Sequence, residues 1–268
     1  MRFRIIYFKI IGFIILFSSI FTLLHSLQIL PVSKSVDIQN NLPWLFSAIS
    51  LIFSIISGFI IQSKWQTWNE LIDATHGEIS SLKQLHMLAN HFPLVVQNTI
   101  RAHIADYLSL IIEETSRDGA IGERSEKVEK AIYALEETVL DINYSEHPNI
   151  GSLAFDLVRK CLEYREKRLQ NISHKLPTGV RFYVVGSTFA IVLFSLFVSI
   201  NQVYYDYFFT LILSLLAFGI YLLIDDLDHP YRPGQWQLTK DGYITLLNSV
   251  EESRINPSSH HTNLQAVK

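Results

Sequence analysis

Residues 45–71 read LFSAISLIFSIISGFIIQSKWQTWNEL, and the architecture expected for the whole chain follows from them. The first part, 45–61, is apolar and uncharged, which suits a helix that crosses a bilayer. Beyond it, apolar residues from Trp65 to Ala89 recur at three- and four-residue steps, which is the pattern of an amphipathic helix. Because no proline or turn cluster separates the two patterns, we predict one long helix that leaves the membrane and ends near residues 90–93.

Three further segments have the length and apolarity of membrane spans, at 5–24, 182–200 and 207–224. The chain has 268 residues, of which 49% are hydrophobic, and its mean hydropathy is +0.23, which is high for a soluble domain. The first segment could also be a cleaved signal peptide, but no small-residue cleavage site follows it at Leu24-His25-Ser26. We therefore expect four retained transmembrane helices.

Positive residues gather on one side of these four segments, which predicts their orientation. They are Arg2, Arg4, Lys64, Arg165, Lys167, Arg168, Lys175 and Arg181. The two loops on the other side, 25–44 and 201–206, contain a single Lys or Arg residue, Lys34. Both termini and the long middle segment are therefore predicted to be cytoplasmic.

The predicted fold class is an all-α membrane protein with a helical cytoplasmic domain inserted between its second and third spans. Residues 1–62 hold the first two spans, 63–179 the cytoplasmic domain, 180–225 the last two spans, and 226–268 a turn and a tail. Within the cytoplasmic domain, apolar periodicity predicts further helices over 94–116, 123–142 and 150–176.

No enzyme signature occurs in the chain. A glycine-rich phosphate loop, a Cys-x-x-Cys pair and a His-Glu-x-x-His motif are all missing from the sequence, so we expect no catalytic residues, no cofactor and no metal site. The single cysteine, Cys161, excludes an intrachain disulfide. A net charge of −3 does not favour nucleic-acid binding.

The second span carries a stripe of hydroxyl groups beside a stripe of apolar side chains. The hydroxyls belong to Ser47, Ser50, Ser54 and Ser57, and the apolar residues are Leu51, Ile55 and Phe59. Small hydroxyl residues let membrane helices pack closely, which is one interpretation. The other is a pore wall, in which an apolar ring gates by dewetting and hydroxyls face the passing ion. A pore of this kind needs several copies of the chain around a symmetry axis.

Three aspartates, Asp225, Asp226 and Asp228, stand at the end of the fourth span, just before Pro230. Carboxylates at a helix C-terminus oppose the helix dipole, so they need compensation. We expect Asp225, Asp226 or Asp228 to meet a basic side chain, such as Arg168, Lys175 or Arg232, or a cluster of backbone N–H groups.

Four short segments, in this order, carry a family resemblance. They are KWQTWNEL at 64–71, GEISSL at 77–82, YREKRL at 164–169, and DHPY at 228–231 with Gly234. With their positions relative to the four spans, they resemble the bestrophin-like domain family over residues 45–247. Through that family the chain distantly resembles the bestrophin anion channels.

The resemblance implies a homopentamer in a membrane, with a central pathway for inorganic anions such as chloride and a helical cytoplasmic vestibule. Leu51, Ile55 and Phe59 would form the pore neck, with Ser47, Ser50, Ser54 and Ser57 as pore-lining hydroxyls. The resemblance makes Asp228, Pro230, Tyr231 and Gly234 a structural turn, and a bacterial inner membrane is the expected location. Residues 235–240, QWQLTK, contain no acidic run, so a calcium clasp is not expected.

The function expected is that of an oligomeric ion channel, most simply one for anions. Lys64, Arg165, Lys167 and Arg168 would either set the topology or attract anions in the vestibule. The alternative is a membrane scaffold or signalling protein that does not conduct and whose cytoplasmic helices bind a partner. A cyclic oligomer with Ser54 and Ile55 facing its axis would favour the channel.

Overall fold

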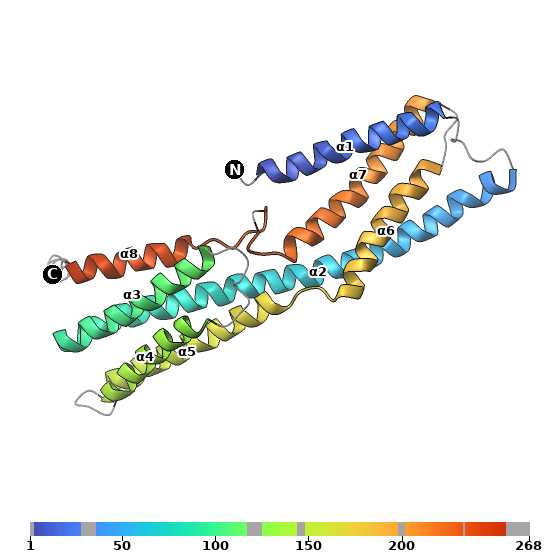
Figure 1. Ribbon diagram of the computed structural model, residues 1–268. Helices are drawn as coiled ribbons and strands as arrows, with labels where there is room; N and C mark the ends of the chain where they lie inside the picture. Colours follow the sequence, from blue (N-terminus) through green and yellow to red (C-terminus); the bar gives the residue numbers. More distant parts are fainter. Residues whose placement is uncertain are drawn as a thin grey trace, which may run out of the picture. The chain divides into compact units, whose positions relative to one another are not determined.

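The computed structural model describes residues 3–27, 36–116, 125–143, 148–197, 202–232 and 234–255 (Figure 1). All regular secondary structure in these ranges is helical. Contacts divide the chain into two compact units, one formed by 1–66 with 175–237 and the other by 67–174 with 238–268.

The first unit contains the apolar helices. They are α1 (Phe3–Ser26), the first part of α2 (Val36–Leu88), α6 (Thr178–Phe197) and α7 (Val203–Leu227). In the described part of the chain, four helices are long and apolar enough to cross a membrane, and each overlaps one of the four predicted spans, of which residues 198–200 lie outside the described ranges. The predicted continuity of the second span is confirmed, because α2 runs without interruption through residue 88.

Aromatic and small residues pack the first unit. Phe17 and Phe21 of α1 pack with Leu196 of α6, and the Ser18 hydroxyl lies 2.7 Å from the Tyr207 hydroxyl of α7. On α2, Phe53 packs with Ile191 of α6 and Ala217 of α7. These contacts leave one long face of α2 without a neighbour in the described part of the unit.

The second unit is a helical bundle with its own apolar core. It contains the rest of α2, the short η1 (Ala89–His91), α3 (Leu94–Ser116), α4 (Glu126–Asn143), α5 (Pro148–Ser173) and α8 (Asp241–Ile255). Each long helix contributes buried residues to one core, among them Leu82, Ile104, Ile132, Val158 and Leu246. Helix α3 has the predicted bounds, and α4 and α5 differ from theirs by up to three residues.

Candidate functional site

The two sides of α2 within the first unit differ sharply in exposure. Leu51, Ile55 and Phe59 are 62%, 52% and 73% exposed, although all three are large and apolar. On the other side, Phe53 and Lys64 are buried. The apolar triplet of the predicted neck therefore lies on the face of α2 that the described helices of the first unit leave uncovered.

The four serines of the second span fall on both sides of this helix. Ser47 and Ser54 are exposed beside the apolar triplet. Ser57 is 1% exposed, and the Oγ atoms of Ser50 and Ser57 are buried with no hydrogen-bond partner in the described part of the chain. The packing interpretation suits Ser50 and Ser57, whereas Ser47 and Ser54 remain candidates for a pore wall.

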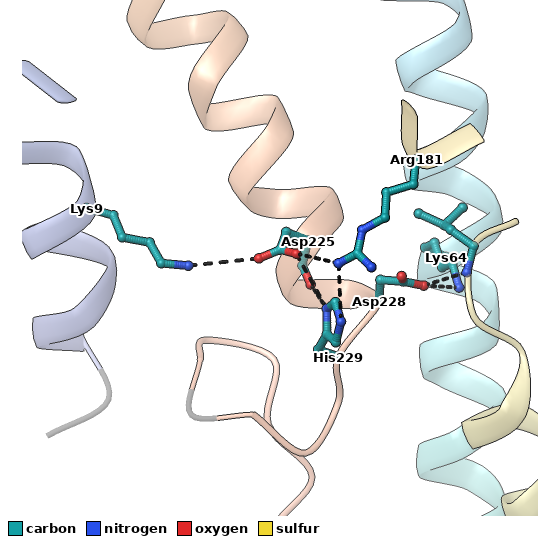
Figure 2. A network of polar contacts seen from close by, with 7 residues as sticks. Lys9, Lys64, Arg181, Asp225, Asp228 and His229 are labelled. Carbon is teal, nitrogen blue, oxygen red and sulfur yellow. Dashed lines mark hydrogen bonds and ion pairs between the residues drawn. The ribbon is translucent and has the colours of Figure 1, made fainter. Parts of the chain in front are cut away.

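A buried ion pair links α2 to the end of α7. Lys64 Nζ lies 2.6 Å from Asp228 Oδ1, and both side chains are almost fully buried (Figure 2). The backbone N–H of Leu176, in the segment before α6, donates a hydrogen bond to the same oxygen at 2.8 Å. Asp228 is the C-cap of α7, so the Lys64 cation compensates a carboxylate that the helix dipole disfavours.

Asp226 shapes the turn that follows α7. Its Oδ2 accepts hydrogen bonds from the backbone N–H groups of Gln235 at 2.8 Å and Trp236 at 3.1 Å. Asp226 Oδ1 occupies the space that a Cβ atom on Gly234 would need. The Trp236 ring meets Trp65 of α2 edge-on, with centroids 4.6 Å apart. A glycine is thus required at position 234, because the Asp226 carboxylate approaches its backbone closely.

Asp225 meets three basic groups more loosely. Lys9 Nζ of α1 and an Arg181 nitrogen of α6 lie 3.9 Å and 3.5 Å from its carboxylate oxygens (Figure 2). The Nδ1 atom of His229 lies 3.5 Å from Asp225 Oδ1 and 2.8 Å from the Asp225 carbonyl oxygen. Lys9 and Arg181 are about half exposed, so these contacts contribute little to stability.

The expected compensation of the three aspartates is therefore confirmed, with different partners from those suggested. The basic partners are Lys64, Lys9 and Arg181 rather than Arg168, Lys175 and Arg232. Helix α7 ends at Leu227, and Pro230 and Tyr231 follow in the turn, where the N–H of Arg232 donates to the carbonyl of His229.

Gly234→Ala is expected to disrupt this turn. The added methyl group would collide with the Asp226 carboxylate, and overpacking of this kind costs about 1–3 kcal/mol. The thermal unfolding midpoint in detergent should fall. Gly219→Ala is the matched control, because a Cβ there meets nothing within 4 Å. Equal midpoints for the two variants would contradict the close approach.

In the second unit, Glu78 of α2 is a fully buried carboxylate that joins four helices. Its oxygens accept hydrogen bonds from Arg168 Nε of α5 at 2.6 Å, Tyr107 of α3 at 2.7 Å and Tyr243 of α8 at 3.1 Å. Burial, and then the charge of Glu78, raises the pKa of Tyr107 well above its usual value. The Tyr107 hydroxyl therefore remains a donor to Glu78.

Tyr164 and Gly77 extend this network. A Cβ on Gly77 would lie 2.5 Å from the Tyr164 ring, so α2 and α5 approach closely at this point.

The charges predicted for the vestibule or for topology differ in exposure. Arg165 pairs with Glu129 of α4 at 3.0 Å. Lys167 is exposed and pairs with Glu163 at 2.9 Å. Of the four charges assigned to the vestibule or to topology, Lys64, Arg165 and Arg168 are thus buried in ion pairs.

Sequence reasoning missed Glu78, Tyr107 and Tyr243. A signal was present for Glu78, because it stands in line with Leu71, Thr75, Leu82 and Leu85 on the buried side of α2. A charge on a buried helix face needs a partner. No group of three or more histidine, cysteine or acidic residues in the described ranges could hold a metal ion.

The four segments that carry the resemblance contact one another in two pairs, one pair in each unit. Lys64 and Trp65 contact the last segment and the turn after it, through Asp228 and Trp236. Gly77 and Glu78 contact Tyr164 and Arg168 of the third segment. A model of the bestrophin-like domain family matches residues 11–242. The chain belongs to the bestrophin-like family.

Solved structures of a bacterial bestrophin homologue from Klebsiella pneumoniae have the same fold. One is 11% identical, with a TM-score of 0.71, and the match covers 92% of this chain and 97% of that chain. A mutant of the homologue is 13% identical, with a TM-score of 0.68, and the match covers 95% and 99% of the two chains. No match was found among curated proteins. At these identities the likeness concerns the fold alone.

Proposed function

We propose that this bestrophin-like protein forms a cyclic homo-oligomer, a pentamer, that conducts anions such as chloride through a central pore lined by α2. The observation that carries the proposal is the uncovered apolar face of Leu51, Ile55 and Phe59 on a helix long enough to span the membrane. Closed rotational symmetry would bring copies of this face together around one axis.

An apolar ring on that axis would act as the neck of the pore. Leu51, Ile55 and Phe59 follow one another at intervals of one helical turn, so copies of them would form three stacked rings. A narrow apolar constriction gates ions by dewetting. Ser47 and Ser54, exposed on the same side, would offer hydroxyl groups above and within this ring.

The orientation proposed here has both termini and the second unit in the cytoplasm of a bacterial inner membrane. The distribution of Lys and Arg around the apolar helices supports it. Lys64, Arg165 and Arg168 are neutralised by buried partners, so their role in this proposal is to hold helices together. Attraction of anions must then come from other groups that face the conduit.

Phe59→Ala tests the neck. Removal of five phenyl groups from the constriction should widen it and ease wetting, so we expect the conductance or the open probability to rise by about twofold or more. The measurement is current through purified oligomers in planar bilayers. Phe189→Ala, on the exposed face of α6, is the matched control and should conduct like the wild type.

Three results would contradict the proposal at different points. Silence of intact wild-type oligomers under all salts and voltages would reject conduction and favour a scaffold. Unchanged currents in both Phe59→Ala and Ile55→Ala would reject the neck. A reversal potential that follows the cation in a salt gradient would reject anion preference.

A further inference from the structure

Two basic side chains of the first unit lie close to the ends of apolar helices. Lys9 belongs to the candidate span Tyr7–Ser26 of α1, and Arg181 belongs to the candidate span Thr178–Phe197 of α6. At a rise of about 1.5 Å per residue, each lies within about 5 Å of the end of its span. In a bilayer this is the depth of the polar headgroups rather than that of the hydrocarbon core.

These two cations approach the same carboxylate from different helices (Figure 2). The oxygens of Asp225, near the end of α7, lie 3.9 Å from Lys9 Nζ and 3.5 Å from an Arg181 nitrogen. The same nitrogen lies 3.5 Å from His229 Nε2. Charge-assisted hydrogen bonds are shorter, about 2.7–2.9 Å. Because lysine has three N–H donors and arginine five, these loose contacts leave most of the donors open to a further acceptor.

Two more exposed cations belong to the segments that adjoin the end of α7. Lys175 immediately precedes Leu176, whose N–H group donates to Asp228. The N–H group of Arg232 donates to the carbonyl of His229 at 3.0 Å. The side chains of Lys175 and Arg232 are exposed, and neither forms an ion pair within the described ranges.

The acidic residues of the first unit do not balance these cations. Asp228 is occupied by Lys64, and Asp226 by backbone N–H groups of the turn. Asp37 and Asp206 belong to the opposite ends of α2 and α7. In the described part of the unit, Asp225 alone is therefore shared among the exposed basic groups at this end.

Large apolar side chains flank both Lys9 and Arg181. Tyr7 and Phe8 precede Lys9 and are 60% and 82% exposed, and Phe182, which follows Arg181, is 75% exposed. A phospholipid suits both features, because its phosphate is anionic and its acyl chains are apolar. A free phosphate ion could use only the cations.

We propose that Lys9 and Arg181 bind the phosphate group of an anionic phospholipid of the surrounding bilayer. Basic groups between transmembrane helices bind lipid headgroups of this kind. The phosphate oxygens would accept charge-assisted hydrogen bonds from both side chains, and the acyl chains would run along the exposed rings. The inference requires only that α1 and α6 span a membrane, so it holds whether or not the protein conducts.

Native mass spectrometry of the purified full chain in detergent tests this site. The protein is given equal amounts of phosphatidylglycerol and phosphatidylcholine, and we expect the wild type to retain phosphatidylglycerol in preference. One basic side chain near a membrane surface strengthens binding of an anionic lipid by about fivefold. The double variant Lys9→Gln/Arg181→Gln should therefore lose about tenfold or more of its affinity for phosphatidylglycerol and retain its affinity for phosphatidylcholine.

The matched control is Arg159→Gln/Lys167→Gln. It also removes one exposed arginine and one exposed lysine, both from α5 in the second unit. Because the change in net charge is the same, this variant should bind phosphatidylglycerol like the wild type. An equal loss in the control would reject the assignment to Lys9 and Arg181.

Two further variants separate binding from misfolding. Lys9→Arg/Arg181→Lys keeps both charges and should bind within about twofold of the wild type. Asp225→Asn removes the competing carboxylate, so it should strengthen binding of phosphatidylglycerol by about two- to fivefold. A gain of this kind cannot come from a damaged fold.

Three results would overturn the inference. They are wild-type binding in Lys9→Gln/Arg181→Gln, binding that Asp225→Asn leaves unchanged or weakens, and a wild type that does not distinguish the two lipids. Inorganic phosphate in large excess should not displace the bound phosphatidylglycerol. Displacement would show a site for free phosphate and reject the lipid.

Discussion

Glu78→Ala is expected to destabilise the second unit by about 3–5 kcal/mol, because removal of one partner from a buried ion pair leaves an uncompensated charge. The Arg168 guanidinium would remain buried without its carboxylate, and the Tyr107 and Tyr243 hydroxyls would lose their common acceptor. A loss of this size is a large part of a typical domain's stability. The thermal unfolding midpoint of the full chain in detergent is the measurement.

A variant of an exposed pair is the control for Glu78. Glu163→Ala removes a carboxylate that pairs with Lys167 at 2.9 Å on the surface of α5. An exposed pair of this kind contributes little, so its midpoint should match that of the wild type. The unfolding midpoint of Glu78→Gln should lie between those of Glu78→Ala and Glu163→Ala, because the amide still accepts hydrogen bonds but carries no charge. Equal midpoints for Glu78→Ala and Glu163→Ala would contradict the role of Glu78.

Asp228→Ala is expected to have the second large effect, a loss of about 3–5 kcal/mol in the first unit, since it strands the buried Lys64 ammonium. It also removes the acceptor for the Leu176 N–H group. Because Lys64 belongs to α2, about one turn beyond Phe59, the variant should alter channel currents as well as the unfolding midpoint.

A double-mutant cycle separates the ion pair from other effects at this position. Lys64→Met together with Asp228→Leu replaces two buried charges by apolar side chains. Proteins in which a buried ion pair is replaced in this way are often as stable as the wild type. The double variant should therefore lose less stability than the two single variants combined, with a coupling of about 1–3 kcal/mol. Additive losses would contradict a direct interaction. The Lys9 side chain is half exposed and lies 3.9 Å from the Asp225 carboxylate, so Lys9→Ala should change the unfolding midpoint little.

Helix positions were predicted well where apolar periodicity was strong. Helix α3 has the predicted bounds, and α2 continues from the apolar segment into the bundle as its pattern indicated. Helix α8 was missed, although Tyr243, Leu246 and Val250 recur at helical spacing and are buried. Polar residues dilute that pattern, and packing of α8 against α3 stabilises a helix that its own sequence indicates only weakly.

The partners of the charged residues could not be predicted. Lys64 and Asp228 were both recognised as notable, but they are far apart in the sequence and were not paired with each other. The exposed and buried serines of the second span were likewise not distinguished, because Ser50 and Ser54 share the same local pattern. Their difference depends on which side of α2 meets α6 and α7.

The sequence by itself determined the helical class, the four apolar spans and the unbroken course of α2, because these properties depend on interactions between residues three or four positions apart. The tertiary structure alone decided which face of α2 is covered, that Asp228 meets Lys64, and that Glu78 joins four helices. These are contacts between distant segments, and they form where burial removes water and leaves each charge dependent on specific protein partners.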